Sequence, residues 1–210
     1  YLDLITNPDS LEVFKKRSQI ISSIRDFFIS HEYLEVETPM MHSILGGAAA
    51  KPFTTHHNAL DMDLYLRIAP ELYLKRLVVG GMERVFEINR NFRNEGLSTK
   101  HNPEFTMLEY YSAYADFNDQ MAFIEKLFIS ITEHVLGSTK LDQDDISYDF
   151  SKPFDRISLK DSVAQKLDVS PDSLDNRDFL IEIGKKNKIE DVESFSDGKI
   201  LFELFEELVE

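Results

Sequence analysis

The middle of the chain carries charged and aromatic residues whose types and spacing could bind an anionic nucleotide beside a cationic ligand. Two strand-like stretches flank a polar loop over residues 94–104, and Lys100 and His101 make the loop tip basic. Side chains of a strand alternate between its two faces. One face of this pair therefore collects Glu87, Asn89, Asn91, Arg93 and Glu95, followed by Phe105, Met107, Glu109 and Tyr111. Arginine can hold an anion, and carboxylates beside a phenol can hold a cation.

A plain hairpin with one solvated face would show the same alternation, since half-exposed antiparallel strands are common. Glu109 argues against this reading, because it lies between Met107 and Tyr111 on a mostly apolar face. A carboxylate in such surroundings needs a partner. The alternation alone predicts a hairpin, and Glu109 favours a binding face.

The elements before this hairpin are short and well marked. Asn7 is an N-cap signal for a helix that runs to about residue 30 at helical apolar spacing. A short alternating strand follows over residues 34–37 and stops at Pro39. The glycine pair at 46–47, followed by three alanines, predicts either a plain turn or a segment where backbone approaches a ligand.

A second strand and two helices complete the first part of the chain. Residues 64–68 alternate as a strand, and a helix begins at Pro70 with Glu71 in its first turn. An acid at that position often only compensates the helix dipole. After the hairpin, residues 118–119 are the expected cap of a helix that closes at Gly137.

The chain becomes more acidic after Thr139. Residues 1–140 hold 19 acidic and 14 basic side chains, whereas residues 141–210 hold 19 and 9. Helices are expected at 159–167, 176–186 and 198–210, and no catalytic constellation is found there. The last of these helical patterns has no C-cap, so we expect the natural protein to continue.

The composition excludes several classes of protein. The 210 residues are 42% hydrophobic, enough for a full core, and no stretch approaches the ~18–20 apolar residues of a membrane span. A net charge of −15 argues against a surface that coats nucleic acid. Cysteine is absent, which excludes disulfides and thiolate metal sites and is compatible with a cytoplasmic protein. The first four residues form neither a signal nor a transit peptide and read like the inside of a longer protein.

Two motifs carry a resemblance to a known class. Residues 92–95 (Phe-Arg-Asn-Glu), 101–105 (His-Asn-Pro-Glu-Phe) and 107–109 (Met-Leu-Glu) resemble motif 2 of class II aminoacyl-tRNA synthetases. The first helix with residues 33–39, ending in Thr-Pro, resembles motif 1, the dimer-forming element of that class.

Three further segments narrow the resemblance to bacterial-type lysyl-tRNA synthetase. They are residues 46–50 (Gly-Gly-Ala-Ala-Ala), 69–76 (Ala-Pro-Glu-Leu-Tyr-Leu-Lys-Arg) and 111–116 (Tyr-Ser-Ala-Tyr-Ala-Asp). The resemblance implies an α+β fold, with part of an antiparallel sheet flanked by helices. It assigns residues 1–140 to the first part of the catalytic domain, with motifs 1 and 2. Residues 141–210 are similar to the helical, here acidic, insertion that follows motif 2.

The resemblance also implies an activity, and with it a set of site residues. The family joins lysine to ATP as lysyl-adenylate and then transfers lysine to tRNA(Lys), as a homodimer in the cytoplasm. Arg93 would be the catalytic residue, and Pro39 would lie at the dimer interface. The expected ATP-binding residues are Arg93, Glu95, Lys100, His101, Asn102 and Phe105. The expected lysine-binding residues are Gly47, Glu71, Arg93, Glu109 and Tyr111.

The chain also departs from the family pattern. The N-terminal anticodon-binding barrel, motif 3 with its arginine, and the late acidic residues that hold Mg²⁺ have no counterpart in these 210 residues. No metal ligand is therefore expected within this chain, and we expect the chain to be inactive alone.

Three alternatives stay open at this point. A paralogue that attaches lysine to elongation factor P shares the motif 2 residues, but segments 46–50 and 69–74 favour the full synthetase. Aspartyl and asparaginyl synthetases share the fold, but their pockets must attract a carboxylate or an amide, which Glu71 and Glu109 disfavour. A dimerisation or regulatory module without catalysis is the third alternative.

Overall fold

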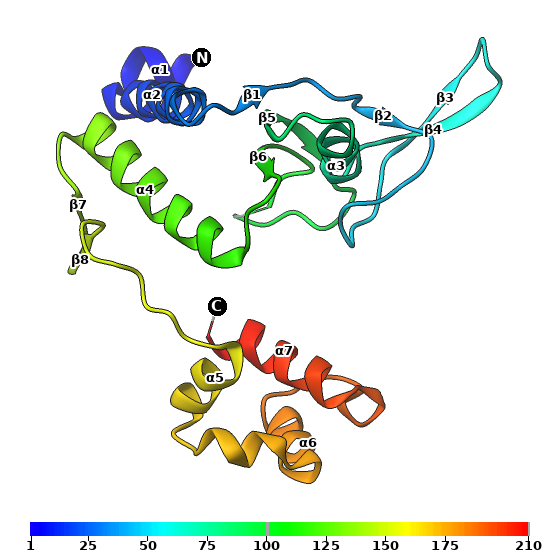
Figure 1. Cartoon of the computed structure of the whole chain (residues 1–210), viewed down its shortest axis with the longest axis vertical. Coiled ribbons are helices and arrows are strands. Elements are labelled where there is room, and N and C mark those ends of the chain that lie inside the picture. The colour runs from blue at the N-terminus through cyan, green and yellow to red at the C-terminus, as the bar shows by residue number, and fades with distance from the viewer. Residues whose placement is uncertain (100, 210) are drawn as a thin grey trace. The chain divides into compact units, whose positions relative to one another are not determined.

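The computed structural model describes residues 1–99 and 101–209 and divides the chain into two compact units, Tyr1–Pro153 and Phe154–Glu210 (Figure 1). Both helices and strands are present, and most strand pairs are antiparallel, which confirms the expected α+β class. The unit boundary lies after a β-hairpin, whereas the sequence predicted only helices beyond residue 140.

Four helices belong to the first unit: α1 (Leu2–Thr6), α2 (Pro8–Ser30), α3 (Glu71–Val79) and α4 (Phe117–Leu136). The predicted cap of α2 is confirmed, because the Asn7 side chain accepts a hydrogen bond from the Asp9 amide at 3.1 Å. The predicted cap of α4 is wrong by two residues. Asp116 is the N-cap, and its side chain and that of Asp119 form a reciprocal capping box.

The main sheet contains β1 (Leu34–Glu35), β5 (Arg84–Phe92) and β6 (Glu104–Ser112) in the order β1-β5-β6. The hairpin β5–β6 is antiparallel, and β1 pairs with β5 in parallel. Glu87 lies opposite Glu109, and Asn91 lies opposite Phe105. Residues that lie opposite each other share a face, so the predicted polar face of this hairpin is confirmed.

Two smaller sheets were largely missed by the sequence analysis. The first has the order β2-β4-β3 and contains β2 (Met41–His42), β4 (Met62–Leu66) and β3 (Thr54–His57). The second is a hairpin of β7 (Lys140–Gln143) and β8 (Ile146–Asp149). Only β4 was expected. The others have two to four residues, which is too short for alternation to distinguish them from loops.

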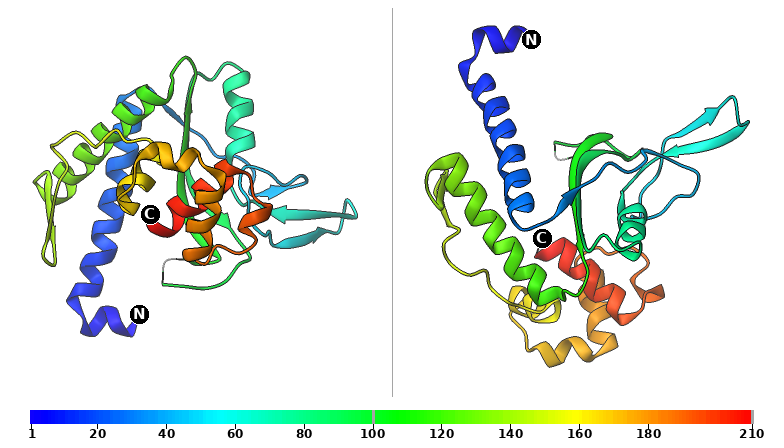
Figure 2. Two further views of the ribbon diagram at one scale, coloured as in Figure 1. Left: turned by 90° about the horizontal axis from the view of Figure 1, so that it is seen from below. Right: turned by 45° about the horizontal axis from the view of Figure 1, so that its top comes forward.

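The core of the first unit lies on the other face of the β5–β6 hairpin. Phe28 of α2 stacks on Phe86 of β5 with ring centroids 4.8 Å apart, and it contacts Tyr110 of β6 and Phe123 of α4 at 4.9 and 5.4 Å. Figure 2 shows α2 and α4 lying side by side against this hairpin. The two helices therefore cover the apolar face of the hairpin and not its polar face.

The second unit is a small helical bundle with its own core. It contains α5 (Leu159–Leu167), η1 (Pro171–Asp175), α6 (Arg177–Lys186), η2 (Val192–Ser194) and α7 (Asp197–Leu208). The three predicted helices are therefore present, to within about two residues at each end. Fully buried Val163, Leu180, Ile200 and Leu204 join α5, α6 and α7.

Among residues 1–99 and 101–209, no helix combines the length and the apolar character needed to cross a membrane.

Candidate active site

A cavity of about 450 Å³ lies where β5 and β6 meet the loop between them. Its walls include five of the six residues predicted to bind ATP: Arg93, Glu95, His101, Asn102 and Phe105. The sixth, Lys100, lies outside the described residues. Gly96 and Thr106 also line the cavity and were not predicted. Strand pairing thus brings both ends of the eleven-residue loop over residues 93–103 to one cavity.

Arg93 is held at the cavity by its backbone and by an aromatic ring. Its amide donates to Pro103 O at 2.9 Å, which extends the hairpin ladder by one residue past β5. Its guanidinium carbon lies 5.2 Å from the centre of the Phe105 ring, a cation–π distance. The buried Nε of Arg93 has no hydrogen-bond partner among the described residues.

The loop that follows the glycine pair is tied to the same end of the hairpin. The Lys51 amide donates to Glu95 Oε1 at 3.3 Å, and Lys51 O accepts from the Asn94 amide at 2.7 Å. At the other cavity wall, the His101 ring nitrogen lies 2.8 Å from Ser98 Oγ. Lys51, four residues after the glycine pair, is therefore held beside the cavity residue Glu95.

Gly47 lies against the start of α3. Its φ is +92°, a backbone conformation that L side chains rarely adopt. A Cβ placed there would lie 3.0 Å from the Glu71 Cβ and 3.2 Å from the Ala69 Cβ. The absence of a side chain at Gly47 therefore lets this backbone contact Glu71, the predicted lysine ligand in the first turn of α3.

Glu109 and Tyr111 form the other half of the predicted lysine site. The Tyr111 hydroxyl donates to Glu109 Oε2 at 3.2 Å. Burial raises the pKa of Glu109 above its ordinary value of 4.5, the Tyr111 hydrogen bond opposes this, and the Glu71 charge raises it further. Burial, followed by the charges of Glu109 and Glu71, raises the pKa of Tyr111. The carboxylates of Glu71 and Glu109 are therefore close enough to repel each other.

Lys75 was missed by the sequence analysis. Its ammonium lies 2.5 Å from Glu71 Oε1 and 5.8 Å from the centre of the Tyr111 ring. A lysine four residues after a glutamate on a helix is the signal that could have found it. The structure thus places a cation of the protein itself between two residues that were predicted to bind the ammonium groups of lysine.

Glu87 shares the polar face but has a different role. It is 1% exposed, and its carboxylate accepts hydrogen bonds from Arg67 Nη1 at 2.7 Å and from Thr38 Oγ1 at 2.7 Å. Arg67 is fully buried and also donates to Arg90 O at 2.9 Å. A charged residue between Leu66 and Ile68 in an apolar strand is the sequence signal for this ion pair, since a buried charge must be paired.

Pro39, the predicted interface residue, is exposed. Its carbonyl accepts a hydrogen bond from His42 Nε2 at 2.8 Å. Burial lowers the pKa of His42, and the hydrogen bond to Pro39 O fixes the chain just after the Thr-Pro pair. No group of three or more histidine, aspartate or glutamate side chains that could hold a metal ion occurs within residues 1–99 and 101–209.

The family model described as tRNA synthetases class II (D, K and N) matches residues 1–196. The chain therefore belongs to this family of class II tRNA synthetases. The lysine–tRNA ligase of Dichelobacter nodosus (strain VCS1703A) is 57% identical over 211 residues. The lysine–tRNA ligase of Escherichia coli (strain K12) is 53% identical over the same length. Each alignment covers 100% of this chain and 42% of the relative.

Proposed function

We propose that this chain supplies the motif 1 and motif 2 part of a lysine–tRNA ligase, which forms lysyl-adenylate from lysine and ATP and transfers lysine to tRNA(Lys). The observation that carries the proposal is one hairpin face that holds both a cavity lined by Arg93 and the partly buried carboxylate of Glu109, which has no ion-pair partner among the described residues. Glu71 of α3, paired with the exposed Lys75, adds a second negative charge that acts on Glu109. The names of the relatives, at 53–57% identity over the whole chain, support lysine as the amino acid.

ATP would occupy the cavity at the end of the hairpin. Phe105 offers a ring on which adenine can stack, and the Glu95 carboxylate with the backbone near Asn102 can hydrogen-bond the base edge. His101, and Lys100 beyond the described residues, would meet the outer phosphates. The proposal is supported by the shared cavity of Glu95, His101, Asn102 and Phe105.

Lysine would lie along the neighbouring part of the face. The α-ammonium would contact Glu71 and the Gly47 carbonyl, and the ε-ammonium would contact Glu109 and the Tyr111 hydroxyl. Each buried ammonium needs such a partner, because an uncompensated buried charge costs ~3–5 kcal/mol. The contact between Gly47 and Glu71 and the hydrogen bond between Tyr111 and Glu109 support these two pairs.

Arg93 would join the two substrates. Adenylation is an attack of the lysine carboxylate on the α-phosphate of ATP, which breaks the bond to the β-phosphate and releases pyrophosphate. The protein mainly positions the two anions and stabilises charge. The planar guanidinium has donors in a fixed fork, so it can hold the phosphate and the carboxylate at once. Its place in the wall of the cavity, with the guanidinium over the Phe105 ring, supports this role.

The reaction belongs to the full-length protein, since the chain spans 42% of the length of its relatives. Mg²⁺ is expected with ATP. The described residues offer no cluster for the ion, so we propose that its ligands lie in the rest of that protein and assign it no step here. The tRNA and cytoplasmic localisation are proposed for the full-length protein as well.

A homodimer through motif 1 is part of the proposal. The part of α2 before Ser23 carries exposed apolar side chains, namely Leu11, Val13, Phe14 and Ile20. Only Ser23, Phe27 and Phe28 of this 23-residue helix are buried. A two-fold interface along α2 and Pro39 would cover this surface. Light scattering of the full-length protein at micromolar concentration should give the mass of a dimer, and a monomer would contradict the interface.

The paralogue that attaches lysine to elongation factor P differs from a lysine–tRNA ligase in the molecule that accepts the lysine. The lysine–tRNA ligase relatives favour tRNA. Full-length protein charged with radiolabelled lysine should label tRNA(Lys) and leave elongation factor P unlabelled. Labelling of the protein acceptor alone would replace the proposed function with that of the paralogue.

Replacing Arg93 tests the proposed chemistry. In the full-length protein, Arg93→Ala should lower lysine-dependent pyrophosphate exchange by about 100-fold or more, the range seen when one group that stabilises the transition state is removed. Arg90→Ala is the matched control, because Arg90 is an exposed arginine on the opposite face of the same strand. Near-normal exchange by Arg93→Ala, or an equal loss in both variants, would refute the role of Arg93.

A further inference from the structure

Buried polar atoms without a partner gather around one residue of β5. Among the described residues, Asn91 is 1% exposed, yet neither its Oδ1 nor its Nδ2 has a hydrogen-bond partner. Two further buried atoms without a partner are Arg67 Nη2 and Arg93 Nε. Buried side-chain polar atoms are nearly always hydrogen-bonded in native proteins. These atoms therefore lack the hydrogen bonds that buried polar groups need.

Arg67 forms hydrogen bonds with the backbone immediately before and after Asn91. Its Nε donates to Arg90 O at 2.9 Å, and its own carbonyl accepts from the Phe92 amide at 2.9 Å. These are the peptide groups immediately before and after Asn91. Arg67 is itself fixed, because its Nη1 donates to the buried Glu87 carboxylate.

Arg93 lies on the other side. It follows Asn91 by two residues, and the ladder continues through the bond between its amide and Pro103 O, so the two side chains share a face. Phe105 is the register partner of Asn91, and the Arg93 guanidinium lies over the Phe105 ring. Asn91 therefore occupies the position between a fixed structural arginine and the proposed catalytic arginine.

The donor and acceptor types of these atoms allow one arrangement of hydrogen bonds among the three side chains. Arg67 Nη2, Arg93 Nε and Asn91 Nδ2 are donors, and Asn91 Oδ1 is the only acceptor in the group. An amide oxygen has two lone pairs, so it can accept from both arginines. Catalytic hydrogen bonds are often long or unformed without ligands and tighten in the complex.

We propose that Asn91 is a positioning residue for Arg93. With lysine and ATP bound, Asn91 Oδ1 accepts from Arg93 Nε and from Arg67 Nη2. This fixes the plane of the Arg93 guanidinium, so that its two terminal nitrogens face the phosphate and the carboxylate. The inference rests on the proposed function, because it acts through the role of Arg93 there.

If Asn91 only supported the fold, its replacement would lower the stability of the protein. Asn91 makes no side-chain hydrogen bond within the described residues, so an apolar side chain of the same size should leave stability unchanged or raise it. Asn89 provides the contrast on the same face of the same strand. Its Nδ2 donates to Glu87 Oε1 at 3.3 Å, and its Oδ1 accepts from the Arg90 amide at 2.8 Å.

The test uses the full-length protein with Asn91→Leu, Asn91→Asp and the matched control Asn89→Leu. Lysine-dependent pyrophosphate exchange and the melting temperature are measured for each. Asn91→Leu should lower kcat about tenfold or more, change the KM for lysine about threefold or less, and leave the melting temperature unchanged or higher. Asn91→Asp keeps an acceptor oxygen and should restore part of the lost kcat. Asn89→Leu should lower the melting temperature with little change in kcat.

Three results would overturn the inference: a kcat for Asn91→Leu within about twofold of wild type, a kcat that falls only in step with the folded fraction, or an Asn91→Asp variant no faster than Asn91→Leu. If Asn91→Leu does not fold, Asn91→Ala takes its place with the same expected loss of kcat. An active wild type with an equally active Asn91 variant would refute this inference alone. A wild type without lysine-dependent exchange would refute the proposed function, and this inference with it.

Discussion

Two glutamates lie opposite each other on the polar face of the hairpin and have opposite surroundings. Glu87 on β5 accepts hydrogen bonds from Arg67 and Thr38 and is 1% exposed. Glu109, its register partner on β6, has the Tyr111 hydroxyl as a partner, and burial raises its pKa. One carboxylate is thus paired with a buried cation, whereas the other has no cation in contact among the described residues.

This difference in surroundings distinguishes a residue that stabilises the fold from a residue that is a candidate to bind a ligand. A paired buried charge holds elements together, here β5, the segment at Thr38 and the segment at Arg67. A partly buried carboxylate without a cation is less stable as the anion, and it gains most from a cation that arrives with a ligand. Residue type and strand position are the same for Glu87 and Glu109, so the partner decides the role.

The largest expected effect concerns stability. Glu87→Gln removes the charge that compensates the buried Arg67, and breaking such a pair costs ~3–5 kcal/mol. Urea denaturation of the full-length protein should therefore show a large loss for Glu87→Gln. Glu109→Gln is the matched control and should be neutral or slightly stabilising at pH 7. Equal losses in the two variants would remove the distinction between the two carboxylates.

The sequence predicted those features of the fold that are encoded by patterns of neighbouring residues. The alternation over β5 and β6 gave the hairpin and the face shared by Arg93, Phe105 and Glu109, and the register confirms that face. Apolar spacing gave α2, α5, α6 and α7 nearly to their ends. These features depend on neighbours in the sequence, so a single chain shows them.

Contacts between distant segments were not predictable in the same way. Arg67 lies 20 residues before Glu87, and Thr38 lies 49 before it. Glu87 therefore looked like any other member of the polar face. The spacing of four residues indicates the pairing of Lys75 with Glu71, but nothing local shows that this pair lies beside Tyr111. The unpartnered amide of Asn91 is likewise visible only once the segment at Arg67 is in place.

A smaller expected effect concerns the pH dependence of lysine binding. The pKa of Glu109 is raised in the folded protein, so as the pH falls through that raised value the carboxylate is protonated and loses its attraction for an ammonium. Lysine affinity of the full-length protein should therefore fall toward acid pH, by about tenfold per pH unit at most. Glu109→Gln should remove that part of the pH dependence. Titrations of lysine between pH 7 and pH 5 measure it, and equal slopes in both proteins would contradict the assignment.

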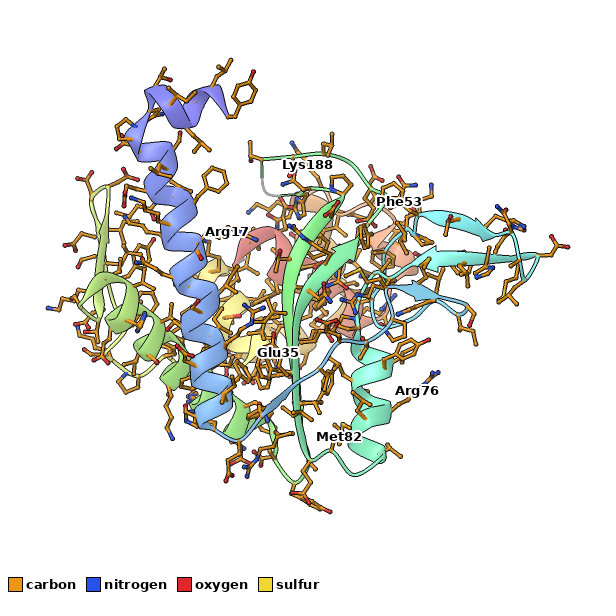
Figure 3. The ribbon with its side chains drawn as sticks, turned by 90° about the horizontal axis from the view of Figure 1, so that it is seen from above. Arg17, Glu35, Phe53, Arg76, Met82 and Lys188 are labelled. Atoms are coloured by element: carbon orange, nitrogen blue, oxygen red, sulfur yellow. The ribbon has the colours of Figure 1, made fainter. Side chains whose placement is uncertain are left out.

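The smallest expected effect concerns Lys75. Its ammonium contacts Glu71, so bound lysine must displace it, and an exposed pair of this spacing contributes ~0.2–0.5 kcal/mol. Lys75→Met should therefore raise lysine affinity about twofold. Arg76→Met is the control on the same helix, because the Arg76 side chain points away from the sheet (Figure 3). An unchanged or lower affinity for Lys75→Met would show that Lys75 does not compete with the substrate.

The central claim is that Glu109 is kept for the ε-ammonium of lysine. Glu109→Gln preserves the shape of the side chain and removes its charge, and leaving a bound ammonium without this partner should cost ~2–5 kcal/mol. Calorimetric titration of lysine and of ATP into full-length wild type and Glu109→Gln is the most direct measurement. We expect lysine affinity to fall at least about tenfold while ATP affinity barely changes. Equal lysine binding by the two proteins would mean that Glu109 is a structural residue like Glu87, and the lysine site would be wrongly placed.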